Sequence, residues 1–499
     1  MKRNFLAYGI VFLSLCCFVD LSVGWSCFIF IALAALLFFQ QRGLGTPLPP
    51  VFLVLLAYVL GYPVVVVIPW MYQDLWAHMN PYIIGLAMLW ACRGFAAFCC
   101  AYLLGDALTR RFHKQKHHGW DDAERLAYVR YAVHTFGIVA IAAWAVRQYY
   151  WGLGLTVAGA QPVVDVNSAG SSIIQALLLL ISLRDPFFFL FGIMYIRRLH
   201  DRFMSILFVG MVATLLPEII GLGSKGAIIR LLVIATLVIA YTTRRLNLKQ
   251  FCAGALMIMI VYMSFLVITE YRQTFSDKYR RGEDVFSFSV QAEAFSGAFL
   301  ASLPFSEKSQ QRRTDVDKTD VLSRIASGIF SFGYMLYFTG ERSPYEYAWQ
   351  TFLIPVYSLV PRALVDKPIF LNPGRFGREY FHSSTAISVS ALGAFYHAWG
   401  YGGIVAGMAF IGVTMAFLIR RTLLRVTALN STVFMVVMVM GLVEVGGSFF
   451  GALNHLSRLA VILLGLYLLY PMLKRLRGGH AAMALPAMPR IGGGYEPPR

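Results

Sequence analysis

The sequence predicts an all-α bundle of about twelve membrane-spanning helices that carries one large extramembrane loop. Hydrophobic residues make up 58% of the 499 residues and charged residues only 14%. Average soluble chains carry about 25% charged residues. Many apolar runs approach the roughly 20 residues that a membrane-spanning helix needs. These runs are continuously apolar and not alternating, which favours a helical bundle over a barrel.

Twelve or so apolar runs are candidate spans. They cover residues 4–19, 22–40, 51–70, 82–105, 128–148, 175–196, 203–222, 226–242, 250–269, 401–419, 430–449 and 456–473. The first run follows Lys2 and Arg3 and has no convincing small-residue cleavage site. We therefore interpret it as a retained span and not as a cleaved signal.

Basic residues predict how the spans are oriented. Clusters such as Arg110 with Arg111 and Arg420 with Arg421 follow the even-numbered crossings, whereas the opposite short loop 71–81 has no Lys or Arg. Because cytoplasmic loops are enriched in Lys and Arg, both termini are expected in the cytoplasm of a multi-pass inner-membrane protein. The net charge of +18 is expected of such a protein, so it does not indicate nucleic-acid binding.

The spans divide the chain into four regions. Residues 1–270 hold nine spans, 391–477 hold three, and 478–499 form a tail rich in Gly, Ala and Pro that we expect to be disordered. Residues 271–390 form one large outer loop with fourteen Lys or Arg and twelve Asp or Glu. Its apolar stretches, 325–338 and 349–359, are expected to form helices that lie on the bundle.

Metal and nucleotide chemistry have no sequence signature here. The seven cysteines fall in predicted spans without disulfide or metal-ligand spacing. A phosphate-binding loop, a dinucleotide fingerprint and an HExxH motif are all absent from the sequence. We therefore expect no cofactor and no metal.

Several ionisable residues fall within or beside the predicted spans, where they are costly and usually face a cavity or a partner. Most of them lie in the outer half and are compatible with a polar vestibule beneath the loop or with internal ion pairs. They are Arg184, Asp185, Glu218, Lys225, Arg230, Glu444, His455 and Arg458. Arg93 also lies deep, where a structural role is favoured.

The large loop is rich in cations that suit phosphate oxygens. Guanidinium groups bind phosphate through two parallel hydrogen bonds, and Lys adds a point charge. The alternatives are anionic lipid headgroups or the acids of the loop itself. The set comprises Arg272, Arg280, Arg281, Arg362, Lys367, Arg375 and Arg378. Arg272 and Arg362 are the strongest candidates, because one leaves a span directly and the other follows Pro361.

Aromatic and imidazole side chains supply further candidates. Tyr396 and Trp399, like the tyrosines of the loop, suit the faces and hydroxyls of sugars, but Tyr and Trp also line membrane interfaces. His382 and His397 are candidate acid–base groups, since imidazole titrates near neutrality. The alternative for each histidine is a hydrogen-bonded structural role.

The order of these motifs resembles that of bacterial O-antigen and exopolysaccharide repeat-unit polymerases of the Wzy type. The match lies within about residues 221–410. It comprises the turn Gly223–Gly226, Glu270-Tyr271-Arg272, Leu359–Arg362 with Asp366-Lys367-Pro368, Thr385–Ser388, and Leu392-Gly393 through Tyr396-His397 to Gly403. The related O-antigen ligases share the architecture.

The resemblance implies a GT-C-like, metal-independent glycosyltransferase. Such enzymes move a growing glycan from undecaprenyl pyrophosphate to the next lipid-linked repeat unit on the periplasmic side. The family arginines map onto Arg272 and Arg362, which together with His382 and His397 are the catalytic candidates. Ala394 stands where the family pattern has an acidic residue, which favours His397 as the base, with His382 and Glu379 as alternatives. The substrate-binding candidates are Lys225, Arg280, Lys367, Arg375, Arg378 and Tyr396.

The expected partners are membrane lipids, the undecaprenyl-pyrophosphate-linked oligosaccharide, a chain-length regulator and a flippase, with no nucleic acid. Three alternatives remain: a ligase that passes glycan to a lipid A core, a lipid-linked oligosaccharide transporter, and a structural partner. A transporter typically shows internal repeats and matched broken helices. The sequence has no visible repeat.

Overall fold

A computed structural model describes eleven stretches of the chain. They are residues 2–42, 51–67, 79–112, 123–150, 180–221, 225–242, 288–302, 327–339, 389–424, 429–443 and 449–478, with single positions 177, 267, 270, 271, 274, 353, 356 and 357. The fold class is all-α. By its contacts the chain divides into a unit of Met1–Arg458 and a second unit of Leu459–Arg499.

The described helices follow the apolar runs of the sequence. They are α1 (Lys2–Cys16), α2 (Val23–Arg42), α3 (Phe52–Val59), the π-helix η1 (Leu60–Val64), α4 (Val65–Val67), α6 (Pro81–Phe112), α7 (Ala123–Tyr150), α9 (Arg184–Ile196), α10 (Arg202–Gly221), α11 (Lys225–Thr242), α13 (Phe288–Ser302), α16 (Ser327–Phe338), α20 (Ala391–Leu424), α21 (Leu429–Val443) and α22 (Phe449–Gly478).

Four of these helices are long and apolar enough to cross a membrane, and they indicate a multi-pass membrane protein. They cover Val23–Gln41, Pro81–Arg110, Leu126–Arg147 and Ala391–Thr422. They have 19, 30, 22 and 32 residues. A hydrocarbon core of about 30 Å needs about 20 residues at a rise of about 1.5 Å per residue, within a range of about 17–25. The other apolar helices are shorter over the residues that the structure describes.

The centre of the larger unit is the pair α6 and α20, which run parallel and in close contact. Gly94 faces Ile404 and Gly105 faces Val413, so the residue numbers rise together along both helices. Glycine at such a seam lets two backbones approach closely, and tight packing is the main attraction between helices in lipid. The seam therefore joins the first quarter of the chain to its last quarter.

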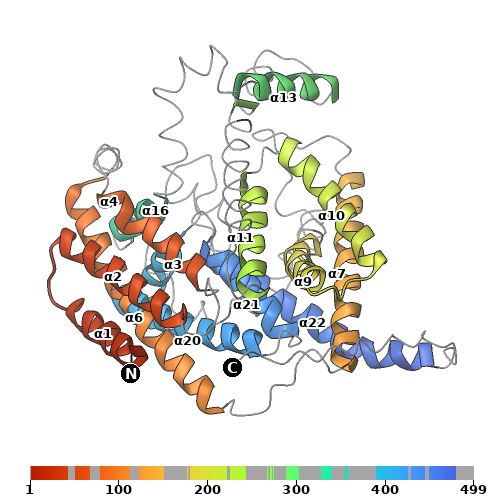
Figure 1. Cartoon of the computed structure of the whole chain (residues 1–499). Coiled ribbons are helices and arrows are strands. Elements are labelled where there is room, and N and C mark those ends of the chain that lie inside the picture. The colour runs from red at the N-terminus through yellow and green to blue at the C-terminus, as the bar shows by residue number, and fades with distance from the viewer. Residues whose placement is uncertain are drawn as a thin grey trace. The chain divides into compact units, whose positions relative to one another are not determined.

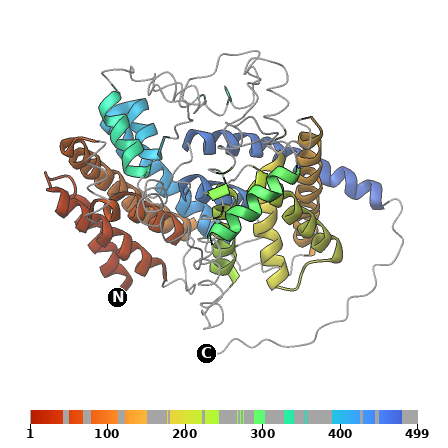
Figure 2. The same cartoon turned by 90° about the horizontal axis from the view of Figure 1, so that it is seen from above.

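Other helices form two groups, of which the first packs on α6 and the second reaches α21. α1 and α2 lie against each other and against α6, as Figure 1 shows. α9 packs on α7 and α11, and α10 packs on α7. α16, from the polar region 271–390, packs on both α6 and α20, and Figure 2 shows it beside α20 from above. The described part of the apolar stretch 325–338, Ser327–Phe338, is thus helical and packs on the bundle, as expected.

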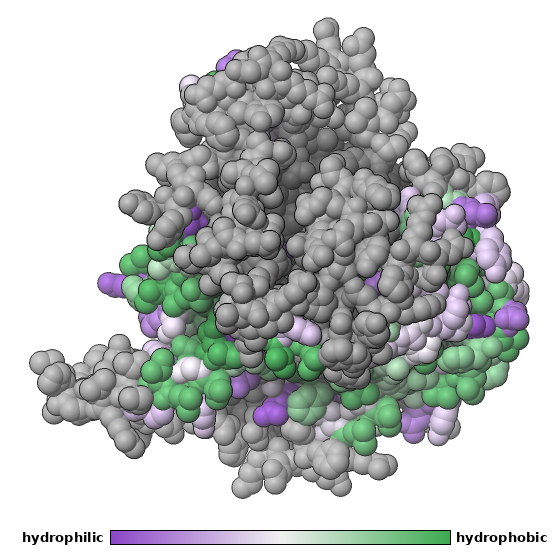
Figure 3. All heavy atoms as spheres, turned by 180° about the vertical axis from the view of Figure 1, so that it is seen from behind, coloured by the Kyte–Doolittle hydropathy of each residue, from purple (hydrophilic) through white to green (hydrophobic). Residues whose placement is uncertain are grey.

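Large apolar side chains are exposed on the outer faces of several helices. Phe5, Tyr82, Ile206, Val209 and Phe410 are each more than 60% exposed. Figure 3 shows such hydrophobic residues over much of the described surface on one face. Soluble monomers rarely expose so much contiguous apolar surface, whereas lipid-facing helices require it.

One predicted span is not a continuous helix. The run 175–196 is interrupted by a turn at Ser182 and Leu183, and α9 begins at Arg184. Pro186 lies in the first turn of α9, where its missing N–H would have no intrahelical partner in any case. The break lies directly before Arg184-Asp185-Pro186, the sequence that interrupts the apolar run of the predicted span 175–196.

Candidate active site

The sequence motif that begins at Leu392 forms a short helix that folds back on the rest of α20. Trp399 and Gly400 have non-helical backbone angles, and Gly400 adopts φ 63° and ψ −153°. Phe395 consequently lies against Gly403 and Gly407, whose missing side chains make room for its carbonyl and ring. The predicted span 401–419 therefore begins at a reversal of the chain, and residues 391–398 form a buried half-helix before it.

The first turn of this half-helix is capped by Ser390 and tied to α16. The Oγ of Ser390 accepts a hydrogen bond from the N–H of Gly393 at 3.3 Å, which is the role of an N-cap serine. Its own N–H donates to Oγ of Ser331 in α16 at 3.0 Å. The ring of Tyr62 in η1 lies beside Gly328 of the same helix α16.

A π-turn lies beside this junction. Pro63 sits inside η1, where it cannot donate a backbone hydrogen bond, and the helix widens over Leu60–Val64. Gly328 of α16 approaches the carbonyl oxygen of Gly61 so closely that an added Cβ would lie 3.1 Å from it. Two irregular backbones, the π-turn and the reversal in α20, are therefore linked through α16 and Ser390. Such irregularities are frequent at functional sites.

His397 lies at the far end of the half-helix and is 2% exposed. Its Nδ1 lies 3.3 Å from Oγ1 of Thr339, which directly follows α16 and is also buried. The imidazole tautomer decides which of the two groups donates. Among the sequence-predicted acid–base candidates, His397 is therefore held by a hydrogen bond to the region 271–390, in a setting screened from solvent.

Aromatic rings surround the reversal. Tyr396 is buried, and its ring centroid lies 5.0 Å from that of Tyr401. Tyr401 stacks on Trp90 of α6 with a centroid separation of 4.2 Å. The rings of Phe395 and Trp399 are stacked on the same half-helix. Tyr396 therefore lies beside Tyr401 within the bundle.

The remaining predicted site residues lie where the structure gives no side-chain description. Lys225, which the sequence places in the turn Gly223–Gly226, is the first residue of α11, but its side chain lies outside the described part. The others fall outside the described residues altogether. They are Arg272, Arg280, Arg281, Arg362, Lys367, Arg375, Arg378 and His382.

Tyr271, next to Arg272, is 3% exposed and packs with Ala294, Ala298 and Phe295 of α13. Burial raises the pKa of Tyr271 to about 12, so its phenol is neutral at pH 7. This small cluster ties the start of the polar region to its first described helix. It therefore fixes the chain immediately before Arg272.

The structure describes the surroundings of two arginines that the sequence places deep in predicted spans, Arg93 and Arg184. Arg93 donates from Nε to the carbonyl oxygen of Cys17 at 3.0 Å and from Nη2 to Asp20 at 3.3 Å. Its guanidinium also lies 4.7 Å from the ring centroid of Trp90. Arg184 is buried at the start of α9. Arg93 thus joins α6 to the turn after α1, the structural role that its depth favours.

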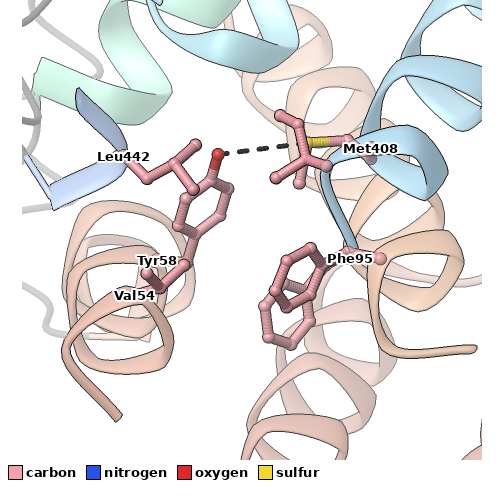
Figure 4. Close-up of a pocket in the computed structure, with 7 residues that line it drawn as sticks. Val54, Tyr58, Phe95, Met408 and Leu442 are labelled. Carbon is pink, nitrogen blue, oxygen red and sulfur yellow. Dashed lines mark hydrogen bonds between the residues drawn. The ribbon is translucent and has the colours of Figure 1, made fainter. Parts of the chain in front are cut away.

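The described helices enclose one apolar pocket, shown in Figure 4. The hydroxyl of Tyr58 points toward Sδ of Met408 at 3.9 Å, with Phe95 and Leu442 beside it. The space leaves no room for a water molecule, so we interpret it as a packing gap and not as a substrate site. Within the described ranges no cluster of three His, Cys, Asp or Glu side chains could hold a metal ion.

No family model, curated protein or solved structure matches the chain. Its function must therefore be argued from its own residues. Sequence reasoning did not single out Thr339, Ser390 or Tyr62, because their roles depend on contacts between distant segments. The glycine-rich sequence Gly400-Tyr401-Gly402-Gly403 is the one local signal that indicates a tight reversal.

Proposed function

We propose that this chain is an inner-membrane polysaccharide polymerase. It would transfer a growing glycan from undecaprenyl pyrophosphate to the next lipid-linked repeat unit on the periplasmic side. The observation that carries the proposal is the hydrogen bond between His397 and Thr339. It joins the half-helix of the family-like motif to the cation-rich region 271–390, where the resemblance expects the chemistry.

The chemistry requires neutralisation of a leaving diphosphate. The acceptor hydroxyl oxygen attacks the anomeric carbon of the donor, the carbon–oxygen bond to the pyrophosphate breaks, and its electron pair leaves with the pyrophosphate. Arg272 and Arg362 would supply fixed positive charge where this negative charge develops, without a metal ion. Lys225, Arg280, Lys367, Arg375 and Arg378 would bind the donor and acceptor phosphates.

The proton of the acceptor hydroxyl needs a base. His397 is our first candidate, because Thr339 holds its Nδ1 and so orients the ring with Nε2 on the opposite edge. Its burial fits a base that meets substrate in a water-excluded chamber. His382 remains the second candidate, and Tyr396 would contact sugar.

The parallel packing of α6 and α20 supports the proposed topology. In that topology both helices cross from the outer to the inner face, so their basic ends meet. The half-helix 391–398 then lies toward the outer face, near the proposed reaction side. Both termini would be cytoplasmic.

Reconstitution tests the proposal directly. Purified protein in lipid nanodiscs would receive lipid-linked repeat units, with and without chelator, and products would be resolved by gel. We expect a ladder that chelator does not change, and its loss in Arg272→Ala and Arg362→Ala but not in Arg202→Ala, an exposed arginine at the start of α10. A strict metal requirement, or full activity in both loop variants, would overturn the mechanism.

One structural feature favours a transporter as the second candidate. The backbone is irregular at η1 and at Trp399–Gly400, and transporters commonly use such discontinuous helices to line a binding site. The same reconstitution separates the two functions. A transporter would move lipid-linked oligosaccharide between leaflets of a vesicle without forming any glycosidic bond. A ligase would form one bond only when a lipid A core acceptor is supplied.

A further inference from the structure

Among the residues that the structure describes, the end of the α6–α20 pair opposite the half-helix carries more positive charge than Asp106 can neutralise. Asp106 is 4% exposed and accepts hydrogen bonds from Arg110, one turn along α6, and from Nη1 of Arg420 at 3.1 Å. Two guanidinium groups therefore share one carboxylate. Arg421 adds a third positive charge beside them.

The two arginines of α20 have hydrogen-bond donors to spare. In the part of the chain that the structure describes, Arg420 makes one hydrogen bond, to Asp106, and Arg421 makes none. Arg421 is exposed, and its guanidinium carbon lies 5.7 Å from the ring centroid of Phe417. A guanidinium carries five N–H donors. Nε of Arg420 is buried, so its second terminal nitrogen Nη2 and the exposed guanidinium of Arg421 are the groups that can receive an anion.

An apolar surface leads up to these arginines along α20. Phe410, Val413 and Phe417 are 63%, 36% and 39% exposed. They recur at intervals of three and four residues, so with Arg421 they form one stripe on the outer face of the helix. The stripe therefore ends in a positive charge.

α6 contributes to the same surface. Leu104 and Leu108 are 57% and 40% exposed. Around the axis of α6, their side chains are rotated by about 100° and 60° from Gly105, which contacts α20, and both rotations are in the same sense. Phe417 lies about 100° ahead of Ala416, which contacts Gly105 from α20. The rotation on α6 is opposite in sense to the rotation on α20. Because the two helices are parallel and face each other, both rotations place the side chains on the same side of the seam. The leucines and the stripe therefore flank one shallow surface.

We propose that this surface binds an anionic phospholipid. Its phosphate is held by Arg420 and Arg421, and its acyl chains lie along Leu104, Leu108 and Phe417. Basic sites between helices at the inner face suit anionic headgroups, whereas a neutral zwitterionic lipid brings a cation that these arginines repel. The lipid would complete the charge balance that Asp106 begins. This inference goes beyond the proposed transferase activity and does not depend on it.

Native mass spectrometry of the purified full-length protein tests the proposal. The probes are phosphatidylglycerol and phosphatidylcholine with identical acyl chains, and separately glycerol phosphate. We expect the wild-type protein to retain phosphatidylglycerol at least about tenfold better than phosphatidylcholine, since a charge-assisted contact is worth about one factor of ten. The preference should fall as salt is raised. Equal retention of the two lipids would overturn the proposal without any variant.

Variants then locate the site. Arg420→Gln and Arg421→Gln should each reduce phosphatidylglycerol retention about tenfold, while Arg202→Gln, an exposed arginine of α10, should not. Phe417→Ser should weaken retention, while Ile206→Ser, an exposed side chain of α10, should not. Unchanged retention in Arg421→Gln, which removes an arginine that makes no hydrogen bond among the described residues, would refute the headgroup site. Saturable displacement of the lipid by glycerol phosphate alone would refute a lipid site and leave a phosphate site.

Discussion

Thr339 Oγ1 lies 3.3 Å from His397 Nδ1, so a residue of the large polar region orients the imidazole of the buried half-helix. If His397 is the base, His397→Ala should lower the rate of ladder formation by about 100-fold or more, the usual contribution of a general base. The measurement is the initial rate of polymer formation in nanodiscs. Thermal unfolding would confirm that the variant remains folded.

The two conservative variants Thr339→Ser and Thr339→Val distinguish the hydrogen bond that orients His397 from the packing of the Thr339 side chain. Serine keeps the hydroxyl and should retain near-normal rates and a normal pH profile. Valine keeps the shape and removes the hydrogen bond, so it should shift the pH profile and cost about 1 kcal/mol of stability. Equal behaviour of the two variants would show that the hydroxyl has no role in catalysis.

Gly400 should tolerate no side chain. Its φ of 63° and ψ of −153° lie in a region that only glycine commonly occupies, so Gly400→Ala should cost about 1–3 kcal/mol. Gly402→Ala is the matched control, because its added methyl would meet no heavy atom within 4 Å. We expect that variant to unfold at or above the wild-type temperature. Thermal unfolding in nanodiscs compares the two, and equal stability would contradict the chain reversal.

Replacement of Gly412, which lies at the α6–α20 seam, should also destabilise the protein. A Cβ there would lie 2.4 Å from the carbonyl oxygen of Phe98, which belongs to the α6 backbone and cannot rotate away. Gly412→Ala should therefore force the helices apart and cost about 1–3 kcal/mol, as overpacking does. Gly24→Ala in α2 has open space around it and serves as the control. A neutral effect at Gly412 would argue against close contact.

The thiols of Cys17 and Cys92 lie close enough to form a disulfide, and both are buried. Their Sγ atoms are 3.4 Å apart, joining the residue after α1 to α6. A mild thiol oxidant would remove two protons and two electrons and form one intramolecular disulfide. Peptide mass spectrometry after oxidation should find this bond in the wild-type protein and not in Cys92→Ser. Failure of the two thiols to cross-link in folded, detergent-solubilised protein would contradict the position of α1 beside α6.

Asp201 should make stability depend on pH at the turn between α9 and α10. Partial burial alone raises the pKa of Asp201, but the N–H of Met204, together with His134 and Arg130, holds it below its ordinary value. A lowered folded pKa gives stability that is present above the unfolded pKa of about 3.9 and is lost as the pH falls through the folded pKa. Asp201→Asn should therefore be less stable than wild type at pH 6, and the difference should shrink toward pH 3. A constant difference would exclude the carboxylate as its source.

Hydropathy predicted the helices well where a segment is continuously apolar. The predicted runs 203–222 and 226–242 correspond to α10 (Arg202–Gly221) and α11 (Lys225–Thr242) within one residue at each end. Burial of a long apolar stretch in lipid leaves few alternatives to a helix, so composition alone decides the outcome. The count of about twelve spans extends over residues beyond those described and stays a prediction.

Hydropathy cannot detect a reversal inside an apolar stretch. Residues 391–422 are apolar on both sides of Gly400, so the half-helix and the following span have the same composition. The π-turn at Pro63 is hidden for the same reason. The motif pointed to Tyr396 and His397, but the partner of His397 lies 58 residues away and only the fold brings it near. Most of the proposed cation site falls outside the described residues and stays a prediction.

The parallel seam has a consequence for biogenesis. Asp106 and Arg420 are 314 residues apart, yet they meet at one end of the α6–α20 pair. During synthesis, the glycine-lined face of α6 has no native partner in the bilayer until α20, in the last quarter of the polypeptide, has been synthesised and inserted. Contacts between such distant segments form late. Until they form, the exposed helix faces of folding intermediates can make non-native contacts with other proteins. Truncated or stalled chains of this protein should therefore be preferred targets of membrane quality-control proteases.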